Sequence, residues 1–399
     1  MQAFITEINI KESINVKNLL ISLSRNKRQH LILTGKNGSG KTNLLKKLYE
    51  YLKYYCGGGN IEFLKLLTYK ENLEESLKKY NNDFNTNHTL QEVKESLKNH
   101  NDDISFKFSQ DDYTTNNPFL IFFDARRNIE FTQVTSIIKP SNFEFDNQVN
   151  KKFLQHLVNL KVQRSFARDD GDLEAVEKID NWFNTFENRL KIIFESDSLS
   201  LNFNRSNFSF NLIIDGNPIE FSSLSDGYAS IISIVSDLLM KMSNNENLLF
   251  EVHGIVLIDE IETHLHVDLQ KNILPFLIDF FPNIQFIVST HSPFVLTSIE
   301  NATICDLEKK IVTSDLSAYS YDTIIESYFG SDKYSKLIKE KVNRYEDLLK
   351  RDNLTNDEHY ELINLKKYFE NVPTYFALEL RSKLLELGIY QNTKPENLN

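Results

Sequence analysis

The sequence is poor in the features that would place it outside the cell or in a membrane. It has only two cysteines, Cys56 and Cys305, which lie far apart and in no metal-binding spacing. This argues against a disulfide framework and favours a reducing cytosol. The chain also lacks a run of about 18 apolar residues and the apolar segment of a signal peptide. We therefore expect a cytoplasmic protein that makes no membrane contact.

An excess of positive charge is also absent. The 56 acidic residues outnumber the 45 basic ones, and the formal net charge is −11. This excludes a uniformly basic coat for nucleic acid, although it leaves room for a local basic groove. Hydrophobic residues make up 41% of the chain, enough for an ordinary globular core. The length suits one large domain with insertions or two smaller domains.

Glycine is scarce, with 12 in the whole chain, yet three glycines fall close together in the segment Gly35–Thr42. This segment fits Gly-x-x-x-x-Gly-Lys-[Ser/Thr], the phosphate-binding P-loop. Residues 30–34 predict a buried strand before it, and residues 43–48 begin an apolar-periodic helix after it. Glycines let backbone N–H groups turn toward phosphate oxygens, and a helix N-terminus favours an anion. A chance match in a glycine turn is the alternative, and the strand–loop–helix context argues against it.

The P-loop predicts the residues that bind ATP and its metal. Lys41 is expected to neutralise the β- and γ-phosphates, and the Thr42 hydroxyl is expected to ligate Mg²⁺. The other nucleotide-binding residues of the loop are Gly35, Asn37, Gly38, Ser39 and Gly40. A second apolar run at 255–258 predicts a strand that ends in Asp259 and Glu260. Asp259 can hold Mg²⁺ at this strand end, and Glu260 can activate water as a general base.

Two further features distinguish the chain from ordinary P-loop GTPases and kinases. Ser225 and Gly227 stand at the start of a long apolar helix, where they offer a second anion-binding surface. Since the chain already has one phosphate cradle, we expect this surface to serve the γ-phosphate held by another copy. His291 follows a predicted strand at 284–289 and can hydrogen-bond a γ-phosphate. A purely structural histidine is the alternative for this position.

The remaining periodicity outlines the rest of the chain. Residues 2–10 and 16–23 predict a small sheet, and the alternation of strand and helix over 254–300 indicates a parallel sheet with crossover helices. Further predicted elements are a strand at 119–123, helices at 150–166 and 173–194, a hairpin at 199–212, and helices at 334–350 and 357–369. Residues 60–117 are polar, with apolar residues spaced for two helices, and a disordered linker is the alternative for this stretch.

In order and spacing, these motifs resemble the ABC-type ATPases of the SMC, RecF and OLD branch. The corresponding motifs are Walker A at Gly35–Thr42, the signature loop at Leu224–Gly227, Walker B at Ile255–Asp259, the catalytic acid Glu260 and the switch histidine His291. The segment Glu260–His266 is similar to the Glu-x-Glu-x-His-Leu-His segment of that branch's standalone bacterial ATPases. Leu224–Tyr228 and Phe123–Arg127 look like segments of the anti-phage ATPases of the Septu and retron-associated, PtuA-like kind. The Q-loop glutamine has no clear counterpart, and Gln133 is the candidate.

The resemblance implies an α/β fold, a P-loop ABC-type ATPase head with a mixed sheet and flanking helices. The expected parts are residues 1–58 as the first part of the head, 59–117 as a helical insertion, 118–310 as the second part with a helical hairpin at 150–195, and 311–399 as a C-terminal helical region. It also implies ATP and Mg²⁺ as cofactors. A homodimer or a higher even oligomer would enclose the nucleotides.

The implied function is ATP hydrolysis that regulates a separate effector in anti-phage defence, with a nuclease as the first candidate. Nucleic acid is left open as a further partner. No apolar strand after residue 300 ends in Asp-x-Asp, so we expect the chain to carry no Toprim nuclease of its own. The alternatives are a RecF-like repair ATPase that DNA stimulates, and a nucleotide-gated scaffold that hydrolyses ATP slowly.

Overall fold

The described part of the protein falls into two compact units. The structure, a computed structural model, describes residues 4–13, 15–56, 73, 88–90, 92, 103–109, 119–126, 149–242, 252–325, 336–351 and 353–370. The first unit is Met1–Tyr321 and the second is Asp322–Asn399. Within these described ranges, no helix is long and apolar enough to cross a membrane.

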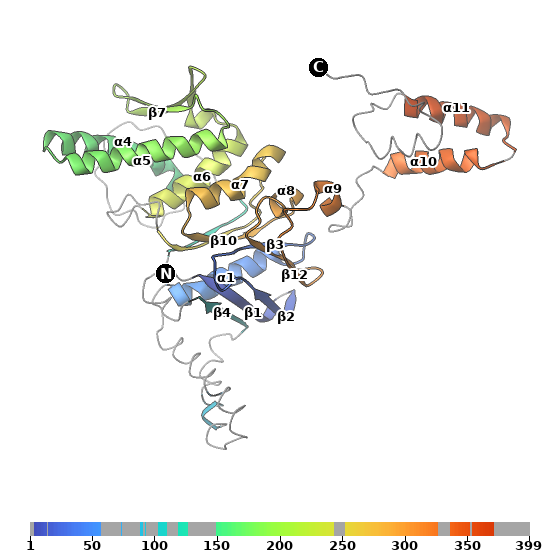
Figure 1. The fold of residues 1–399 in the computed structure, drawn as a ribbon, viewed down its shortest axis with the longest axis horizontal. Coiled ribbons are helices and arrows are strands. Elements are labelled where there is room, and N and C mark those ends of the chain that lie inside the picture. Colours follow the sequence, from blue (N-terminus) through green and yellow to red (C-terminus); the bar gives the residue numbers. More distant parts are fainter. Residues whose placement is uncertain are drawn as a thin grey trace. The chain divides into compact units, whose positions relative to one another are not determined.

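A six-stranded sheet forms the centre of the first unit (Figure 1). Its strands, in spatial order, are β12 (Ile311–Ser314), β11 (Ala302–Asp306), β3 (His30–Thr34), β10 (Ile284–Ser289), β9 (Gly254–Ile258) and β5 (Phe119–Phe123). All neighbours are parallel except β11 and β12, so the sheet is mixed. The parallel strands β3, β9, β10 and β11 are buried along their whole length, which requires layers on both faces. The predicted α/β fold with a mixed sheet and flanking helices is confirmed.

Helix α1 (Lys41–Cys56) lies between the central sheet and a smaller antiparallel sheet. The smaller sheet has the order β2 (Val16–Ser22), β1 (Ile5–Ser13) and β4 (Ile104–Phe108). One hydrophobic cluster joins all three layers, for example through Ile8 of β1, Leu45 of α1 and Leu257 of β9. The small sheet predicted from residues 2–10 and 16–23 is therefore confirmed, and it holds α1 in place behind the P-loop.

The other face of the central sheet is helical. Figure 1 draws α6 (Asp226–Met242) and α7 (Val267–Phe280) on the opposite side of β10 from α1. Helix α7 is the crossover between the parallel strands β9 and β10, and the short helix α8 (Pro293–Leu296) follows β10. This alternation of strand and helix is the one predicted for residues 254–300.

A helical hairpin and a third sheet complete the first unit. The hairpin consists of α4 (Val149–Asp169) and α5 (Leu173–Ile193), and the sheet of β6 (Ser200–Asn204), β7 (Ser209–Ile214) and β8 (Asn217–Glu220), followed by the 3₁₀ turn η2 (Phe221–Ser223). The Asp172 side chain caps α5 by accepting a hydrogen bond from the Ala175 N–H over 3.0 Å. Trp182 stacks on Phe186 with ring centres 5.4 Å apart, so the apolar stripe of α5 is core, as predicted.

The second unit contains the two helices that were predicted near the end of the chain. They are α10 (Lys336–Leu349) and α11 (Asn356–Glu370), and the three-residue helix α9 (Tyr321–Thr323) lies at the boundary of the units. Tyr345 of α10 meets Phe369 of α11 with ring centres 5.8 Å apart. Arg344 and Glu361 form an ion pair between the same helices, 2.6 Å from nitrogen to oxygen.

Two expectations of helix are wrong. Ile104–Phe108, inside the stretch 59–117 expected to be helical, is strand β4 and pairs with β1. Ile311–Ser314, expected to begin the C-terminal helical region, is strand β12 at the edge of the central sheet. Both segments are short, and pairing with a neighbouring strand overrides their local composition. The domain boundaries at 58, 117 and 310 stay predictions.

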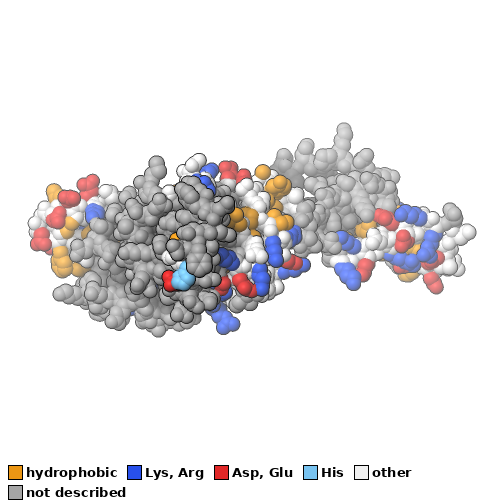
Figure 2. Space-filling view, turned by 90° about the horizontal axis from the view of Figure 1, so that it is seen from below, with side chains coloured by type: hydrophobic (Ala, Val, Ile, Leu, Met, Phe, Trp, Pro, Cys, Tyr) orange, Lys and Arg blue, Asp and Glu red, His pale blue; other side chains and the backbone are white. Residues whose placement is uncertain are grey.

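The surface charge is mixed in sign where it can be seen. Figure 2 shows Lys and Arg side chains interspersed with Asp and Glu on the described part of that face. This matches a chain of formal net charge −11. Any basic site must therefore be local.

Candidate nucleotide-binding site

The P-loop joins β3 to α1 and has the backbone conformation that its glycines predict. Gly35, Gly38 and Gly40 have φ angles of 131°, 83° and 97°, in the region that side chains disfavour. A Cβ atom on Gly35 would lie 3.2 Å from the Glu308 nitrogen, and one on Gly40 would lie 3.1 Å from the Asn15 Cβ. These glycines therefore permit both the turn and the close approach of two other segments.

Lys41 begins α1 and turns its amine back into the loop. Its Nζ donates to the carbonyl oxygen of Gly35 over 2.8 Å and to that of Lys36 over 3.2 Å. Burial lowers the pKa of Lys41, while the negative charges of Glu260, Glu262 and Asp259 oppose that shift. A phosphate is a stronger acceptor than these two carbonyls, so the amine is already placed to exchange them for one.

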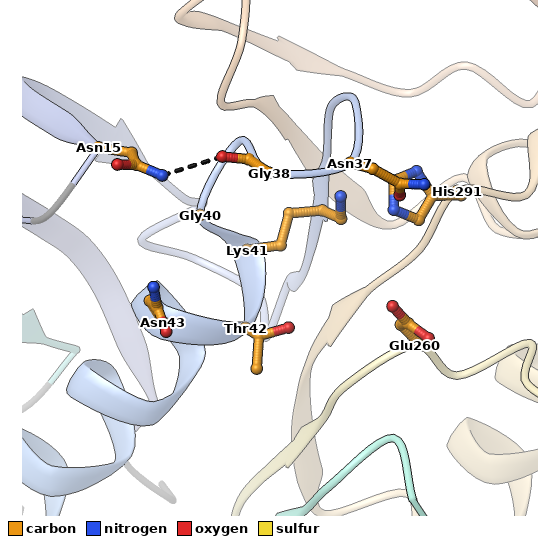
Figure 3. A pocket seen from close by; sticks show the side chains of 9 residues that line it. All are labelled: Asn15, Asn37, Gly38, Gly40, Lys41, Thr42, Asn43, Glu260 and His291. Atoms are coloured by element: carbon orange, nitrogen blue, oxygen red, sulfur yellow. Dashed lines mark hydrogen bonds between the residues drawn. The ribbon is translucent and has the colours of Figure 1, made fainter.

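A pocket of about 180 Å³ lies beside this loop (Figure 3). Its walls are Asn15, Asn37, Gly38, Gly40, Lys41, Thr42, Asn43, Glu260 and His291. The structure thus brings together Lys41, Thr42, Glu260 and His291, which are far apart in the sequence. Gly35 and Ser39 lie in the loop without lining the pocket, and the buried Ser39 hydroxyl has no hydrogen-bond partner among the described residues. A glycine-built cradle with a buried lysine and an unsatisfied hydroxyl fits a phosphate chain.

The carboxylates after β9 are fixed by the neighbouring strand β10. The Ser289 hydroxyl donates to Oδ1 of the buried Asp259 over 2.5 Å. It also accepts the main-chain N–H of Glu260 over 2.8 Å. Glu260 has a φ of 44°, a left-handed conformation that is costly for a residue with a side chain. This backbone turns Glu260 into the pocket wall while Asp259 stays beneath it.

The donor set around Thr42 suits a hard cation. In Figure 3 the Thr42 hydroxyl points toward the side of the pocket where Glu260 lies. A hydroxyl and a carboxylate are oxygen ligands of the kind that Mg²⁺ takes when substrate phosphates and water complete its shell. Within the described residues, no group of three or more His, Cys, Asp or Glu side chains is arranged to hold a metal. Thr42 lines the pocket and the buried Asp259 does not, so a Mg²⁺ ion held by this pair stays a prediction and would need the phosphates of a nucleotide to complete its ligands.

His291 follows β10 and faces the P-loop across the pocket. Its main-chain N–H donates to Oε1 of Glu262 over 2.6 Å. The other carboxylate oxygen of Glu262 is buried and finds no hydrogen-bond partner in the part of the chain that the structure describes. Burial lowers the pKa of His291, the charge of Lys41 lowers it further, and the negative charge of Glu262 opposes both. At neutral pH the ring is therefore uncharged, with one N–H available for donation.

The two predicted signature residues stand apart from this pocket. Neither Ser225 nor Gly227 lines it. Ser225 is exposed at the start of α6, where its carbonyl oxygen accepts the Ala229 N–H over 2.9 Å. Gly227 is buried, and a Cβ there would lie 3.0 Å from the Leu269 side chain and 3.3 Å from the His264 carbonyl oxygen. A side chain at this position would crowd its own chain, so packing within one chain favours glycine here.

Three residues of the site escaped the sequence analysis. Asn15, in the turn between β1 and β2, donates from Nδ2 to the Gly38 carbonyl oxygen over 2.9 Å. Glu308, just after β11, pairs with the Lys36 amine over 2.8 Å and holds the P-loop from the other side. Asn43 lines the pocket directly after Thr42. Only Asn43 had a signal, its place next to the motif. Asn15 approaches through the packing of the small sheet on α1, and Glu308 through the pairing of β11 with β3. Gln133 lies outside the described residues.

Comparison with known proteins supplies the family. The family described as "AAA domain, putative AbiEii toxin, Type IV TA system" matches residues 62–297, more than half of the chain. This chain belongs to that family. The match begins after the P-loop and includes Ser225, Gly227, Asp259, Glu260 and His291.

Two curated relatives cover part or nearly all of the chain. The Retron Ec83 probable ATPase of Escherichia coli is 29% identical over 245 residues, 56% of this chain and 45% of that protein. The Septu protein PtuA of Bacillus mycoides (strain KBAB4) is 26% identical over 416 residues, 97% of this chain and 55% of that protein. The chain thus spans about half the length of these relatives. The resemblance to Septu and retron-associated ATPases is confirmed.

A solved structure of an SmcHead bound to the C-winged helix domain of ScpA also aligns with the chain. It is 13% identical with a TM-score of 0.40, and the alignment covers 79% of this chain and 99% of that chain. A superposition this loose adds nothing to the strand order described above.

Proposed function

We propose that this protein binds and hydrolyses ATP as a homodimer and thereby controls a separate effector in anti-phage defence. One arrangement carries the proposal: Glu260 and His291 face Lys41 and Thr42 across a single pocket at the edge of a parallel sheet. Ligands of open α/β sheets bind at this carboxyl edge. The family match and the names of the relatives, a retron ATPase and a Septu protein, support the same reading.

Each residue has a role that follows from its place. The glycines at 35, 38 and 40 let the loop surround the phosphates, and Lys41 exchanges its two carbonyl contacts for phosphate oxygens. Mg²⁺, when held by Thr42 and Asp259, supplies charge neutralisation between the phosphates. Glu260 takes the proton of the attacking water, and the neutral His291 ring donates to the oxygen on which charge develops.

The signature loop completes the site from a second copy. Ser225 is exposed and outside the pocket of its own chain, so it is available to the γ-phosphate of a partner. The start of α6 adds the partial positive charge of a helix N-terminus. Two copies related by a two-fold axis would each give a P-loop and a signature loop, which makes the dimer a condition for hydrolysis.

The effector side of the proposal rests on the names of the relatives, a retron ATPase and a Septu protein. Among the described residues beyond 300, Asp306 at the end of β11 accepts hydrogen bonds from the N–H groups of Glu308 and Lys309, and Glu308 pairs with Lys36 of the P-loop. These two acids therefore support the P-loop, and we assign nucleic-acid cleavage to a separate partner.

Two variants test the proposal. Lys41→Ala should abolish binding of a fluorescent ATP analogue, because the phosphates lose their principal charge. Glu260→Gln should keep binding, release phosphate at least about a hundredfold more slowly, and accumulate a dimer in ATP during size-exclusion chromatography with light scattering. Lys53→Ala, at the far end of α1, is the matched control. Unchanged affinity in Lys41→Ala would overturn the site, and a monomer in ATP for both wild type and Glu260→Gln would overturn the dimer.

A further inference from the structure

A second and larger pocket, of about 760 Å³, opens between α4 and the β6–β7 hairpin. It shares no lining residue with the P-loop pocket. Figure 1 draws α4, α5 and β7 in one group, and α4 contacts β7 directly. Its volume falls in the range of ligand sites, about 300–1,000 Å³. The proposed ATP hydrolysis makes no use of it.

Basic side chains dominate the wall of this pocket. Four cations, Lys161, Arg164, Arg168 and Arg205, stand against one carboxylate, Asp169. This is a local excess of positive charge in a chain whose formal net charge is −11. A concave patch of one sign attracts an anion from close by, while the rest of the surface repels it.

Two of the four cations contact helix α5, and the other two are exposed. Arg164 forms a two-point ion pair with Asp180 of α5, 2.6 Å from Nη2 to Oδ2. Lys161 places its amine 3.8 Å from the centre of the Phe183 ring, and burial lowers the pKa of this amine. These two hold the hairpin together. Arg168 and Arg205 are exposed, and neither forms an ion pair within the described part of the chain, so both can meet a phosphate.

Aromatic rings lie among these cations. Phe166 is 62% exposed, although a phenylalanine normally gains from burial. Phe208 ends the β6–β7 turn with a φ of 56°. That conformation suits glycine or asparagine, and for a bulky residue it is a true outlier. The turn thus holds a strained backbone at Phe208, whose ring lies at the edge of the pocket.

We propose that this pocket binds a short segment of single-stranded nucleic acid. Unpaired bases stack on Phe166 and Phe208, and the phosphates between them meet Arg168 and Arg205. Stacking rings beside a cationic groove are the means by which proteins hold single strands without reading sequence. A duplex keeps its bases paired and stacked on one another, so it offers these rings nothing. Binding here does not depend on hydrolysis at the P-loop.

Fluorescence anisotropy with the full chain, in the absence of ATP, tests this. The probes are labelled dT and U oligonucleotides of about ten nucleotides, a hairpin duplex, and unlabelled TMP as a competitor. Arg168→Glu with Arg205→Glu should weaken single-strand binding at least tenfold and reduce the slope of log Kd against log salt by about 0.7 for each arginine. The matched control is Arg25→Glu with Lys27→Glu, which makes the same change in charge on an exposed loop.

The rings need variants of their own. Phe166→Ala removes an exposed ring at little cost to folding and should weaken binding about fivefold or more. Phe208→Gly should also weaken binding, yet leave the melting temperature equal or higher because it relieves the strained φ. Single-strand binding that these changes reduce, and that the control double variant leaves intact, supports the proposal. It is overturned by absent single-strand binding, by equal loss in the control, by preference for the duplex, or by TMP competing as well as an oligonucleotide.

Discussion

The main-chain N–H of His291 donates to the Glu262 carboxylate over 2.6 Å. Glu262 lies on the turn after β9 and His291 follows β10, so this bond ties two strand ends that face the P-loop. It fixes the main chain at His291 and thereby the position from which the His291 ring reaches the pocket. Glu262 thereby acts as a positioning residue, because it reaches the nucleotide only through His291.

Glu262→Ala should lower kcat for ATP at least tenfold while KM changes by less than about threefold, since a hydrogen bond to a charged group is worth about 1.5–3 kcal/mol. Glu262→Gln keeps an acceptor for the His291 N–H and should restore most of kcat. Both variants remove a charge that raises the pKa of His291, so the acid limb of the pH–rate profile should move to lower pH. Glu300→Gln, an exposed acid after α8, is the control. Equal kcat in the Ala and Gln variants would contradict the positioning role.

The signature loop calls for a variant that does not disturb packing. Gly227→Ala should lower the melting temperature, because its Cβ would press on Leu269 and the His264 carbonyl. Ser225→Arg should leave the melting temperature unchanged, since Ser225 is exposed, yet abolish hydrolysis by blocking the approach of a second copy.

Mixing inactive Ser225→Arg with inactive Lys41→Ala then tests the role in trans. A mixed dimer pairs one intact P-loop with one intact signature loop, so the mixture should recover part of the wild-type phosphate release. Failure to recover, when cross-linking shows that mixed dimers have formed, would assign the loop to its own chain.

Asn15 and Glu308 each hold the P-loop by one contact, so we expect their loss to weaken nucleotide binding in steps. Glu308→Gln and Asn15→Ala each remove one contact from the loop and should weaken ATP binding about two- to fivefold, the scale of an exposed ion pair or a single hydrogen bond. Hydrogen exchange at residues 36–40 should quicken in both. Glu12→Gln, which breaks the exposed pair with Lys17 in the β1–β2 ribbon, should change neither quantity. Full affinity in the Asn15→Ala, Glu308→Gln double variant would show that the loop needs no support.

Acid should destabilise the first unit through His30. Burial lowers the pKa of His30 to about 4, and its Nδ1 accepts the Phe286 N–H over 3.1 Å. Between pH 6.5 and 4, His30 binds a proton in the unfolded chain but stays unprotonated in the folded chain. Its contribution to the free energy of unfolding is therefore fully present above pH 6.5 and is lost as the pH falls. At pH 5 the loss is about 2 kcal/mol. Asp237, whose pKa burial raises to about 6, acts in the opposite sense.

His30→Asn keeps an acceptor near the position of Nδ1 and cannot titrate in this range. Its urea unfolding, followed by the fluorescence of Trp182, should depend less on pH between 6.5 and 4.5 than that of the wild type. His266→Asn, at an exposed position before α7, is the control. An identical pH dependence in His30→Asn and wild type would refute the assignment.

The sequence predicted the parts of the site that lie in one continuous segment. Gly35–Thr42 carries its own strand, turn and helix, so local spacing was enough to place Lys41 and Thr42. The apolar run before Asp259 placed the two acids at a strand end, and the buried strands β9 and β10 were read from their composition. The α4–α5 hairpin followed from helical spacing alone.

What the sequence did not show depends on pairing between distant strands. Asn15 reaches the P-loop because the β1–β2 sheet packs against α1, and Glu308 reaches it because β11 pairs with β3. Neither arrangement follows from a local sequence pattern. The strand β4 lies in a polar stretch that favours helix by composition. The packing of Gly227 against Leu269 is a property of the assembled layers, and no local sequence pattern predicts it.

The position of β3 in the central sheet determines when, during synthesis, the P-loop can adopt its folded conformation. The ribosome makes this strand and its loop long before the neighbours of β3, because both neighbours come from residues 284–306. Pairing over so large a separation is slow and cannot begin until the later strands have emerged. A nascent chain that ends before residue 284 therefore contains the P-loop motif but neither strand that pairs with β3. We expect such a chain to bind ATP only after β10 and β11 have been made and have paired with β3.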